Sequence, residues 1–203
     1  PKKSFVFCCF NNNYKITPST FESWMRILKA VNGSVLWLYE NDKNSVNNLK
    51  KEATKLGVSE NQLIFAGHMP VEEHLNRIKF ADLFIDTLPY NAHTTCSDAL
   101  RMGVPVLTLI GKSFASRVAA SLLNAVNLPE LITSTPEEYE ALAIELATNP
   151  KKLKSIKDKL AKNLSTAPLY NTKLFTKNLE SAFTQMYERH HGGLEPDHIY
   201  VEQ

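Results

Sequence analysis

The clearest chemical pattern in the sequence lies between Asp86 and Asp98, where the residues read Asp-Thr-Leu-Pro-Tyr-Asn-Ala-His-Thr-Thr-Cys-Ser-Asp. An apolar run that predicts a buried strand ends near Asp86, and a helix is expected to begin at about Thr94. Free N–H groups and the positive dipole end of a helix start favour an anion, and the hydroxyls of Thr94 and Thr95 add donors. Asp98, one turn further along, has the chemistry to accept hydrogen bonds from a sugar diol. An ordinary helix cap, with His93 on the surface and Asp98 in solvent, accounts for the same spacing.

A second polar segment follows the first apolar run and contains Asn12 and Lys15 within the sequence Asn-Asn-Asn-Tyr-Lys. It also lies between an expected strand and an expected helix. Both segments should therefore meet at the carboxyl end of a parallel sheet, where ligands bind in open α/β folds. The ammonium of Lys15 could neutralise a phosphate, and the asparagines offer amide donors. A turn rich in asparagine with an exposed lysine is the competing interpretation.

A third candidate is the pair His74 and Arg77, which lie three residues apart on a short expected helix and so share a face. An imidazole can stack on a flat base, and an arginine can bridge to it. The alternative is a surface helix on which Glu73 and Arg77 form an ion pair worth a few tenths of a kcal/mol.

Several common motifs are absent from the sequence. It contains no G-x-G-x-x-G after the first apolar run, no G-x-x-x-x-G-K-[ST] and no Asp-x-Asp, and its histidines lack metal-ligand spacing. Neutralisation of a phosphate is therefore expected to come from a helix dipole, lysine, arginine and hydroxyls. We expect no cofactor and no metal.

The elements that must position these residues follow an alternating pattern. Short apolar runs alternate with longer amphipathic ones, which predicts a doubly wound, Rossmann-like parallel sheet in an α/β fold. The expected strands cover residues 4–9, 34–39, 62–65, 83–86, 104–108 and 130–132. The expected helices begin at Pro18 and continue with residues 44–56, 71–78, 94–102, 116–127, 136–148, 151–164 and 171–189. From residue 135 onward only helices are expected, and these should pack around the sheet.

Length and composition narrow the class of protein. A chain of 203 residues suits one α/β domain, and a formal net charge of +2 is too small to favour nucleic acid or an anionic membrane as the main partner. The three cysteines, with no C-x-x-C spacing, favour a reduced cytoplasmic compartment. No apolar run approaches the ~20 residues of a membrane span. The abrupt start on Pro-Lys-Lys leads us to expect a piece of a longer polypeptide.

Taken together, these segments resemble one family, the O-linked N-acetylglucosamine transferases and their bacterial relatives, which form glycosyltransferase family 41. The His-Thr-Thr and Ala-Ser-Arg-Val-Ala-Ala-Ser blocks are the most specific. The matching blocks keep the family's order along nearly the whole chain: Phe10 to Lys15, Ser34 to Leu38, Glu72 to His74, Ala81-Asp82, Asp86-Thr87, His93 to Thr95 with Asp98, Ala115 to Ser121, Pro168 to Lys173, and Pro196 to His198.

The resemblance implies the carboxyl-terminal lobe of a GT-B type enzyme, in which two doubly wound domains face each other and this lobe holds most of the donor. Residues 1–134 would form the nucleotide-sugar-binding core. Residues 135–190 would form helices packed on the same lobe, and residues 191–203 would form a tail. The long last helix would cross toward the other lobe.

The resemblance also implies roles for the polar residues around the donor phosphates. Lys15 would contact the phosphates and be important for catalysis, and Asn12 takes a position where a phosphate-contacting glutamine is common. His93, Thr94 and Thr95 would cradle the diphosphate.

A second set of residues would hold the nucleoside. His74 and Arg77 would flank the uracil, and Asp98 would hold the ribose. Val71 departs from the pattern of the animal enzyme, which has a ribose-contacting lysine there. Ribose affinity or donor choice is therefore expected to differ.

The function implied is inverting, metal-independent transfer of a sugar, N-acetylglucosamine from UDP-N-acetylglucosamine, to serine or threonine hydroxyls of cytoplasmic proteins. The acceptor would bind through an amino-terminal lobe and helical repeats that these residues do not include, and this chain alone is expected to be nearly inactive. The motifs leave the base and sugar open, because a plant branch of the family uses GDP-fucose. Two alternatives remain: another two-lobed sugar-nucleotide enzyme, with a small acceptor or epimerase activity, and a nucleotide-binding module without catalysis.

Overall fold

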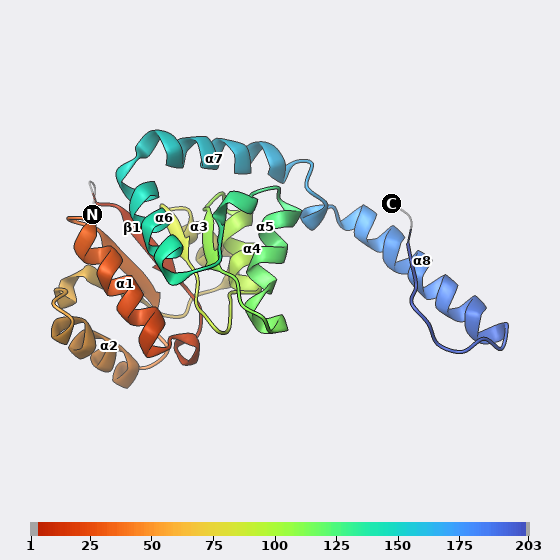
Figure 1. Cartoon of the computed structure of the whole chain (residues 1–203), viewed down its shortest axis with the longest axis horizontal. Helices are drawn as coiled ribbons and strands as arrows, with labels where there is room; N and C mark the ends of the chain where they lie inside the picture. The colour runs from red at the N-terminus through yellow and green to blue at the C-terminus, as the bar shows by residue number, and fades with distance from the viewer. Residues whose placement is uncertain (1–3, 202–203) are drawn as a thin grey trace.

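A computed structural model describes residues 4–201, and its centre is one parallel sheet (Figure 1). The strands are β1 (Val6–Cys9), β2 (Val35–Tyr39), β3 (Leu63–Ala66), β4 (Leu83–Ile85), β5 (Val106–Leu109) and β6 (Ile132–Thr133). They run in the order β3-β2-β1-β4-β5-β6, and every adjacent pair is parallel. This order, with its switch between β1 and β4, is that of a doubly wound Rossmann-like sheet, so the predicted fold class is confirmed.

The central strands of the sheet are buried on both faces, as their flat apolar sequences predict. Phe7, Leu36 and Ile85 have no exposed surface. Cys8 of β1 is aligned with Trp37 of β2 on one side and with Phe84 of β4 on the other. The carboxyl ends of these strands therefore lie at one edge, and the loops that follow them meet there.

In the part of the chain that the structure describes, the helices around the sheet are α1 (Pro18–Ala30), α2 (Lys43–Lys55), α3 (Val71–Ile78), α4 (Thr94–Arg101), α5 (Val118–Ala125), α6 (Pro136–Thr148) and α7 (Pro150–Leu164). Helix α6 packs against α1 and over β4 and β5, while α4 and α5 contact each other and β5. Threonine caps followed by proline explain two helix starts, since Thr17 accepts a hydrogen bond from Thr20 and Thr135 accepts one from Glu138. Among residues 4–201, no helix combines the length and apolar character needed to cross a membrane.

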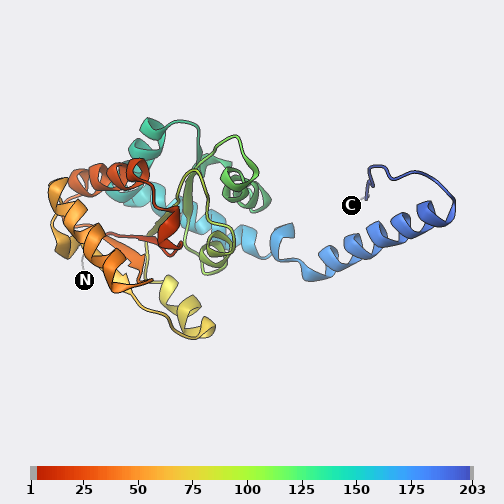
Figure 2. The same cartoon turned by 90° about the horizontal axis from the view of Figure 1, so that it is seen from below.

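Helix α8 (Thr172–His191) differs from the packed helix that we expected in residues 135–190. It extends away from the sheet and its flanking helices, and none of its residues is buried (Figures 1 and 2). Its contacts with the lobe are made near the 3-10 turn Pro168–Tyr170. The apolar side chains of Phe175, Phe183 and Tyr187 are exposed. The amphipathic pattern correctly predicted a helix, but the sheet that it was expected to cover is already covered by α1 to α7.

A buried chain of hydrogen bonds joins α1, α6 and the end of β4. The indole Nε1 of Trp24 donates to the hydroxyl of Tyr139 at 3.1 Å, and that hydroxyl donates to the backbone carbonyl of Asp86 at 3.0 Å. Trp24 is fully buried and Tyr139 nearly so. The tyrosine hydroxyl therefore satisfies one donor and one acceptor that water cannot reach.

The variant Tyr139→Phe is expected to lower the free energy of unfolding by about 2 kcal/mol, because it leaves the Trp24 N–H and the Asp86 carbonyl unsatisfied in the core. Urea denaturation measures the change. Tyr187→Phe, on the exposed face of α8, is the matched control and should change stability by less than about 0.5 kcal/mol. Equal stabilities of Tyr139→Phe and wild type would contradict the assignment of this hydroxyl.

Candidate functional site

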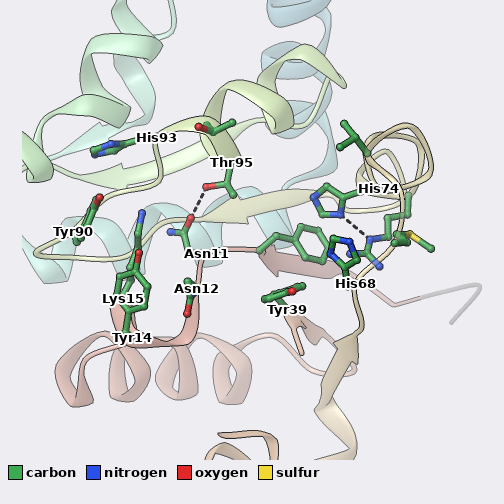
Figure 3. A pocket seen from close by; sticks show the side chains of 15 residues that line it. Asn11, Asn12, Tyr14, Lys15, Tyr39, His68, His74, Tyr90, His93 and Thr95 are labelled. Carbon is green, nitrogen blue, oxygen red and sulfur yellow. Dashed lines mark hydrogen bonds between the residues drawn. The ribbon is translucent and has the colours of Figure 1, made fainter. Parts of the chain in front are cut away.

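A cavity of about 490 Å³ lies at the carboxyl end of the sheet, between the loop after β1, the start of α3 and the start of α4 (Figure 3). This volume falls within the usual range for small-molecule sites. The structure brings seven of the eight sequence-predicted site residues to its wall: Asn12, Lys15, His74, Arg77, His93, Thr94 and Thr95. Their roles stay predictions, but their convergence from three separate segments is a property of the fold.

The eighth residue, Asp98, is not among the residues that line the cavity. It lies one turn into α4 and is partly buried. Burial raises the pKa of the Asp98 carboxyl, and the nearby charge of Arg101 opposes that shift. Its distance along the helix from Thr94 places it beyond the anion-binding end of α4.

The start of α4 is open to a ligand. No side chain caps this helix, so its first N–H groups lack the partner that a cap would supply. Thr94 is exposed on the cavity side. The Nε2 of His93 is 3.3 Å from the carbonyl of Ala115, and because a carbonyl only accepts, this nitrogen must carry the proton. The helix end thus keeps free N–H donors, and their role in binding an anion stays a prediction.

Lys15 approaches from the loop after β1. Its Nζ donates to the carbonyl of Asn91 at 2.9 Å and lies 3.8 Å from the centre of the Tyr90 ring. Burial lowers the pKa of the Lys15 ammonium from its ordinary value, and the negative charge of Asp86 opposes that shift. A cation is therefore held in place beside the loop that leads into α4.

His74, His68 and Tyr39 line the cavity on the side away from Lys15 and His93 (Figure 3). The Nε of Arg77 donates to Nδ1 of His74 at 3.0 Å, and its Nη1 donates to the carbonyl of Gly67 at 2.8 Å. His74 therefore carries its proton on Nε2, and burial followed by the charges of Arg77 and His68 lowers the pKa of the imidazole. The centroids of the Phe10 ring and the His74 imidazole are 5.2 Å apart, and the two rings are packed edge to face. Arg77 builds this wall instead of forming the surface pair with Glu73.

Beneath the cavity lies a buried carboxylate, Asp86, at the end of β4. It accepts hydrogen bonds from the backbone N–H groups of Ala92 at 2.6 Å and Thr87 at 2.7 Å. The hydroxyl of Thr108 donates to it at 2.7 Å and the amide of Asn11 at 3.3 Å. Burial raises the pKa of the Asp86 carboxyl to about 6, while these hydrogen bonds favour its ionised form. One side chain thus fixes the loop between β4 and α4.

The Ala-Ser-Arg block also supports that loop. The carbonyl of Ala115 accepts from the backbone N–H of Asn91 at 2.9 Å and from His93. The N–H of Gly111 donates to the carbonyl of Ser116 at 2.9 Å, and a Cβ on Gly111 would lie 2.4 Å from the Ser116 hydroxyl oxygen. Only glycine fits this close approach, which keeps the Ala115 carbonyl beneath the start of α4.

Sequence reasoning missed part of the cavity wall. Its missed members are mostly aromatic or uncharged residues in the same loops: Phe10, Asn11, Tyr14, Tyr39, His68, Met69 and Tyr90. Their positions at the end of β2 and just after β1, β3 and β4 were a usable signal, because side chains at the carboxyl ends of neighbouring parallel strands converge. Residue type alone gave no reason to select them.

Comparisons with known proteins agree with this fold. The family model described as "Glycosyl transferase family 41" matches residues 1–179. The chain is 35% identical over 199 residues to a UDP-N-acetylglucosamine–peptide N-acetylglucosaminyltransferase of Caenorhabditis elegans, covering 98% of this chain and 17% of that protein. It is 38% identical to SEC of Arabidopsis thaliana over 202 residues, covering 99% of this chain and 21% of that protein.

A solved structure shows the same lobe. A mutant of the Thermobaculum terrenum O-GlcNAc transferase superposes with a TM-score of 0.85 at 33% identity, over 91% of this chain and 36% of that one. The present chain therefore spans only about a fifth of the two curated relatives, and its Rossmann-like sheet is a lobe of the GT-B type. On the extent of the family match and on these identities, the chain belongs to glycosyl transferase family 41.

Proposed function

We propose that this chain is the donor-binding lobe of an inverting, metal-independent glycosyltransferase that moves N-acetylglucosamine from UDP-N-acetylglucosamine to serine or threonine hydroxyls of proteins. One observation carries the proposal: the uncapped start of α4 and the ammonium of Lys15 line the same cavity. Helix N–H groups and a fixed cation are the donors that a diphosphate requires.

The cavity can be divided along the expected donor. The diphosphate lies at the start of α4, between His93 and Lys15, with Asn12 beside it. The uracil lies against the side chains of His74 and Arg77. Because Arg77 donates to Nδ1 of His74, the Nε2 proton of the imidazole is free to donate.

The ribose is held between these two ends. Asp98 is the proposed ribose ligand, reached by a donor that extends past the first turn of α4. Val71 lies exposed on the cavity wall and offers the ribose only apolar contact.

The chemistry follows from where charge develops. The acceptor oxygen attacks the anomeric carbon from the face opposite the diphosphate, the bond from that carbon to the phosphate oxygen breaks, and the electron pair leaves with UDP. Fixed N–H donors and the Lys15 ammonium stabilise that growing negative charge more strongly than they stabilise the intact donor. The proton of the acceptor hydroxyl goes to a general base outside this lobe.

The acceptor site belongs to the same proposal. We assign it and the general base to an amino-terminal lobe, and protein recognition to helical repeats, because the chain spans 17% and 21% of its curated relatives. A cytoplasmic location is supported by the three free, buried cysteines. The net charge of +2 gives no support for nucleic acid or membrane as a main partner.

Titration of this chain with UDP by calorimetry tests the proposal. Lys15→Met and Thr94→Val are each expected to weaken UDP binding by about tenfold, since each removes a hydrogen bond to a charged group. Lys51→Met, on the exposed face of α2, is the matched control and should leave the affinity unchanged. Absence of UDP binding at millimolar concentration by the folded chain would contradict the function, and tighter binding of GDP than of UDP would contradict the choice of base.

A further inference from the structure

A hydrogen bond links the loop after β1 directly to the first turn of α4, beside Lys15 and His93 (Figure 3). It connects the hydroxyl of Thr95, in the first turn of α4, to the side-chain oxygen of Asn11, which follows β1. These residues are 84 positions apart in the sequence, and Asn11 is only 1% exposed. Asn11 begins the loop that carries Lys15, so the bond links the loop with the cation to the helix with the N–H donors.

The orientation of the Asn11 amide is determined by its neighbours. Its Nδ2 donates to Asp86 at 3.3 Å and to the hydroxyl oxygen of Thr87 at 2.8 Å. Thr87 uses its own proton on the carbonyl of Tyr90, at 2.6 Å, and can only accept from Asn11. Both hydrogens of the amide are therefore used, and its oxygen must face Thr95.

The orientation of the Asn11 amide determines which group donates in the bond between Asn11 and Thr95. An amide oxygen only accepts, so the hydroxyl of Thr95 must be the donor. That hydroxyl then presents only lone pairs to the cavity, and lone pairs repel a phosphate oxygen. The neighbouring Thr94 is exposed, and within residues 4–201 no hydrogen bond engages its hydroxyl, so its proton is free for a ligand.

We propose that Thr95 and Asn11 are positioning residues that latch the Lys15 loop to the start of α4, and that Thr94 alone of the two threonines gives its hydroxyl to the anion. The anion here is the diphosphate of the proposed function, on which this second half rests. The latch fixes the separation between the ammonium and the helix N–H donors before the ligand arrives. Such pre-organisation removes an ordering cost from binding and from the transition state.

A double-mutant cycle for UDP binding tests the latch on this chain. Thr95→Val is expected to weaken binding by about fivefold in the wild-type background, with Thr95→Ser restoring it, because serine keeps the donor. In the Asn11→Ala background, Thr95→Val should change the affinity by less than about twofold, because the bond is already broken. Thr94→Val should keep its full loss of about tenfold in both backgrounds.

Two results would overturn the latch: a full fivefold loss from Thr95→Val in the Asn11→Ala background, or no recovery with Thr95→Ser. If Thr94→Val no longer weakened UDP binding in the Asn11→Ala background, the proposal that Thr94 alone gives its hydroxyl to the anion would be overturned. If wild type binds no UDP, the proposed function fails, and urea unfolding of the same variants judges the latch separately. Independent effects of Asn11→Ala and Thr95→Val on unfolding would then refute it, whereas coupled effects would support it.

Discussion

Replacing Lys15 with methionine is expected to lower the turnover number of the complete transferase by about 10²–10³-fold, the size of effect seen when one electrostatic donor to a developing charge is removed. Methionine keeps an unbranched side chain of similar length but lacks the ammonium, whose nitrogen lies 3.8 Å from the centre of the Tyr90 ring. It removes the charge and the hydrogen bond to the Asn91 carbonyl. The packing of the loop is largely retained, so the loss reports on charge.

Lys15→Met should affect the turnover number more strongly than the donor affinity. The negative charge on UDP grows as the bond to the sugar breaks, so the ammonium should stabilise the transition state more than the bound donor. Donor affinity should therefore fall only about tenfold while the turnover number falls further. Steady-state kinetics on a peptide acceptor measure both, with Lys51→Met as control. A turnover number within about threefold of wild type would contradict a catalytic role for Lys15.

The sheet could be predicted because each of its signals is local. Runs such as Val35–Tyr39 are flat and apolar, and both faces of that strand lie in the core. Thr17 and Thr135, each followed by proline, placed two helix starts correctly. Helix α5 begins two residues later than predicted, because Phe114–Ser116 forms a separate 3-10 turn.

The position of α8 could not be predicted by the same reasoning. Its periodic apolar residues indicate a face that avoids water, but periodicity does not say which surface covers that face. The sequence pattern is equally compatible with a helix on this sheet and with one that leaves it. Only the packing of α6 and α7 around the lobe decides between these arrangements.

Part of the cavity wall could likewise be predicted from local sequence signals. Charged and hydroxyl residues placed after strands, such as Lys15 and Thr94, could be assigned to one edge of the sheet because parallel strands end together. The proton positions on His74 and Thr95 could not be predicted from the sequence, since each depends on a hydrogen-bond partner elsewhere in the fold. Asn11 illustrates the difficulty, because its role rests on contacts with Asp86 and Thr95, 75 and 84 residues away.

The variant Asp86→Asn is expected to remove a loss of stability that the wild-type protein shows between about pH 4 and pH 6. Burial raises the pKa of this carboxyl from 3.8 to about 6 in the folded protein. Because the folded state then binds the proton more tightly than the unfolded state, the stabilisation is fully present below the unfolded pKa and is lost as the pH rises through about 6. The difference between the two pKa values corresponds to about 3 kcal/mol.

Urea unfolding at a series of pH values from 4 to 7 measures this effect as the difference between wild type and Asp86→Asn, in which contributions from other carboxyl groups cancel. Asp158→Asn, at an exposed position on α7, is the matched control and should follow the wild-type curve. Parallel curves for wild type and Asp86→Asn would contradict a carboxyl that titrates near pH 6.

A neutral amide at position 86 would avoid the loss of about 3 kcal/mol at neutral pH and could take the same place. An asparagine oxygen can still accept from the Ala92 and Thr87 N–H groups, and the Thr108 hydroxyl can turn to accept from the amide. The oxygen that accepts from Asn11 is the same Oδ1, so it stays an oxygen in this variant, and the Thr87 hydroxyl can still only accept from the Asn11 amide. We therefore expect Asp86→Asn to gain stability at pH 7 and to keep its UDP affinity within about twofold of wild type, because the Asn11 amide keeps its orientation toward Thr95. A fivefold loss of UDP affinity in this variant, as expected for Thr95→Val, would show that the orientation of Asn11 depends on the charge of Asp86.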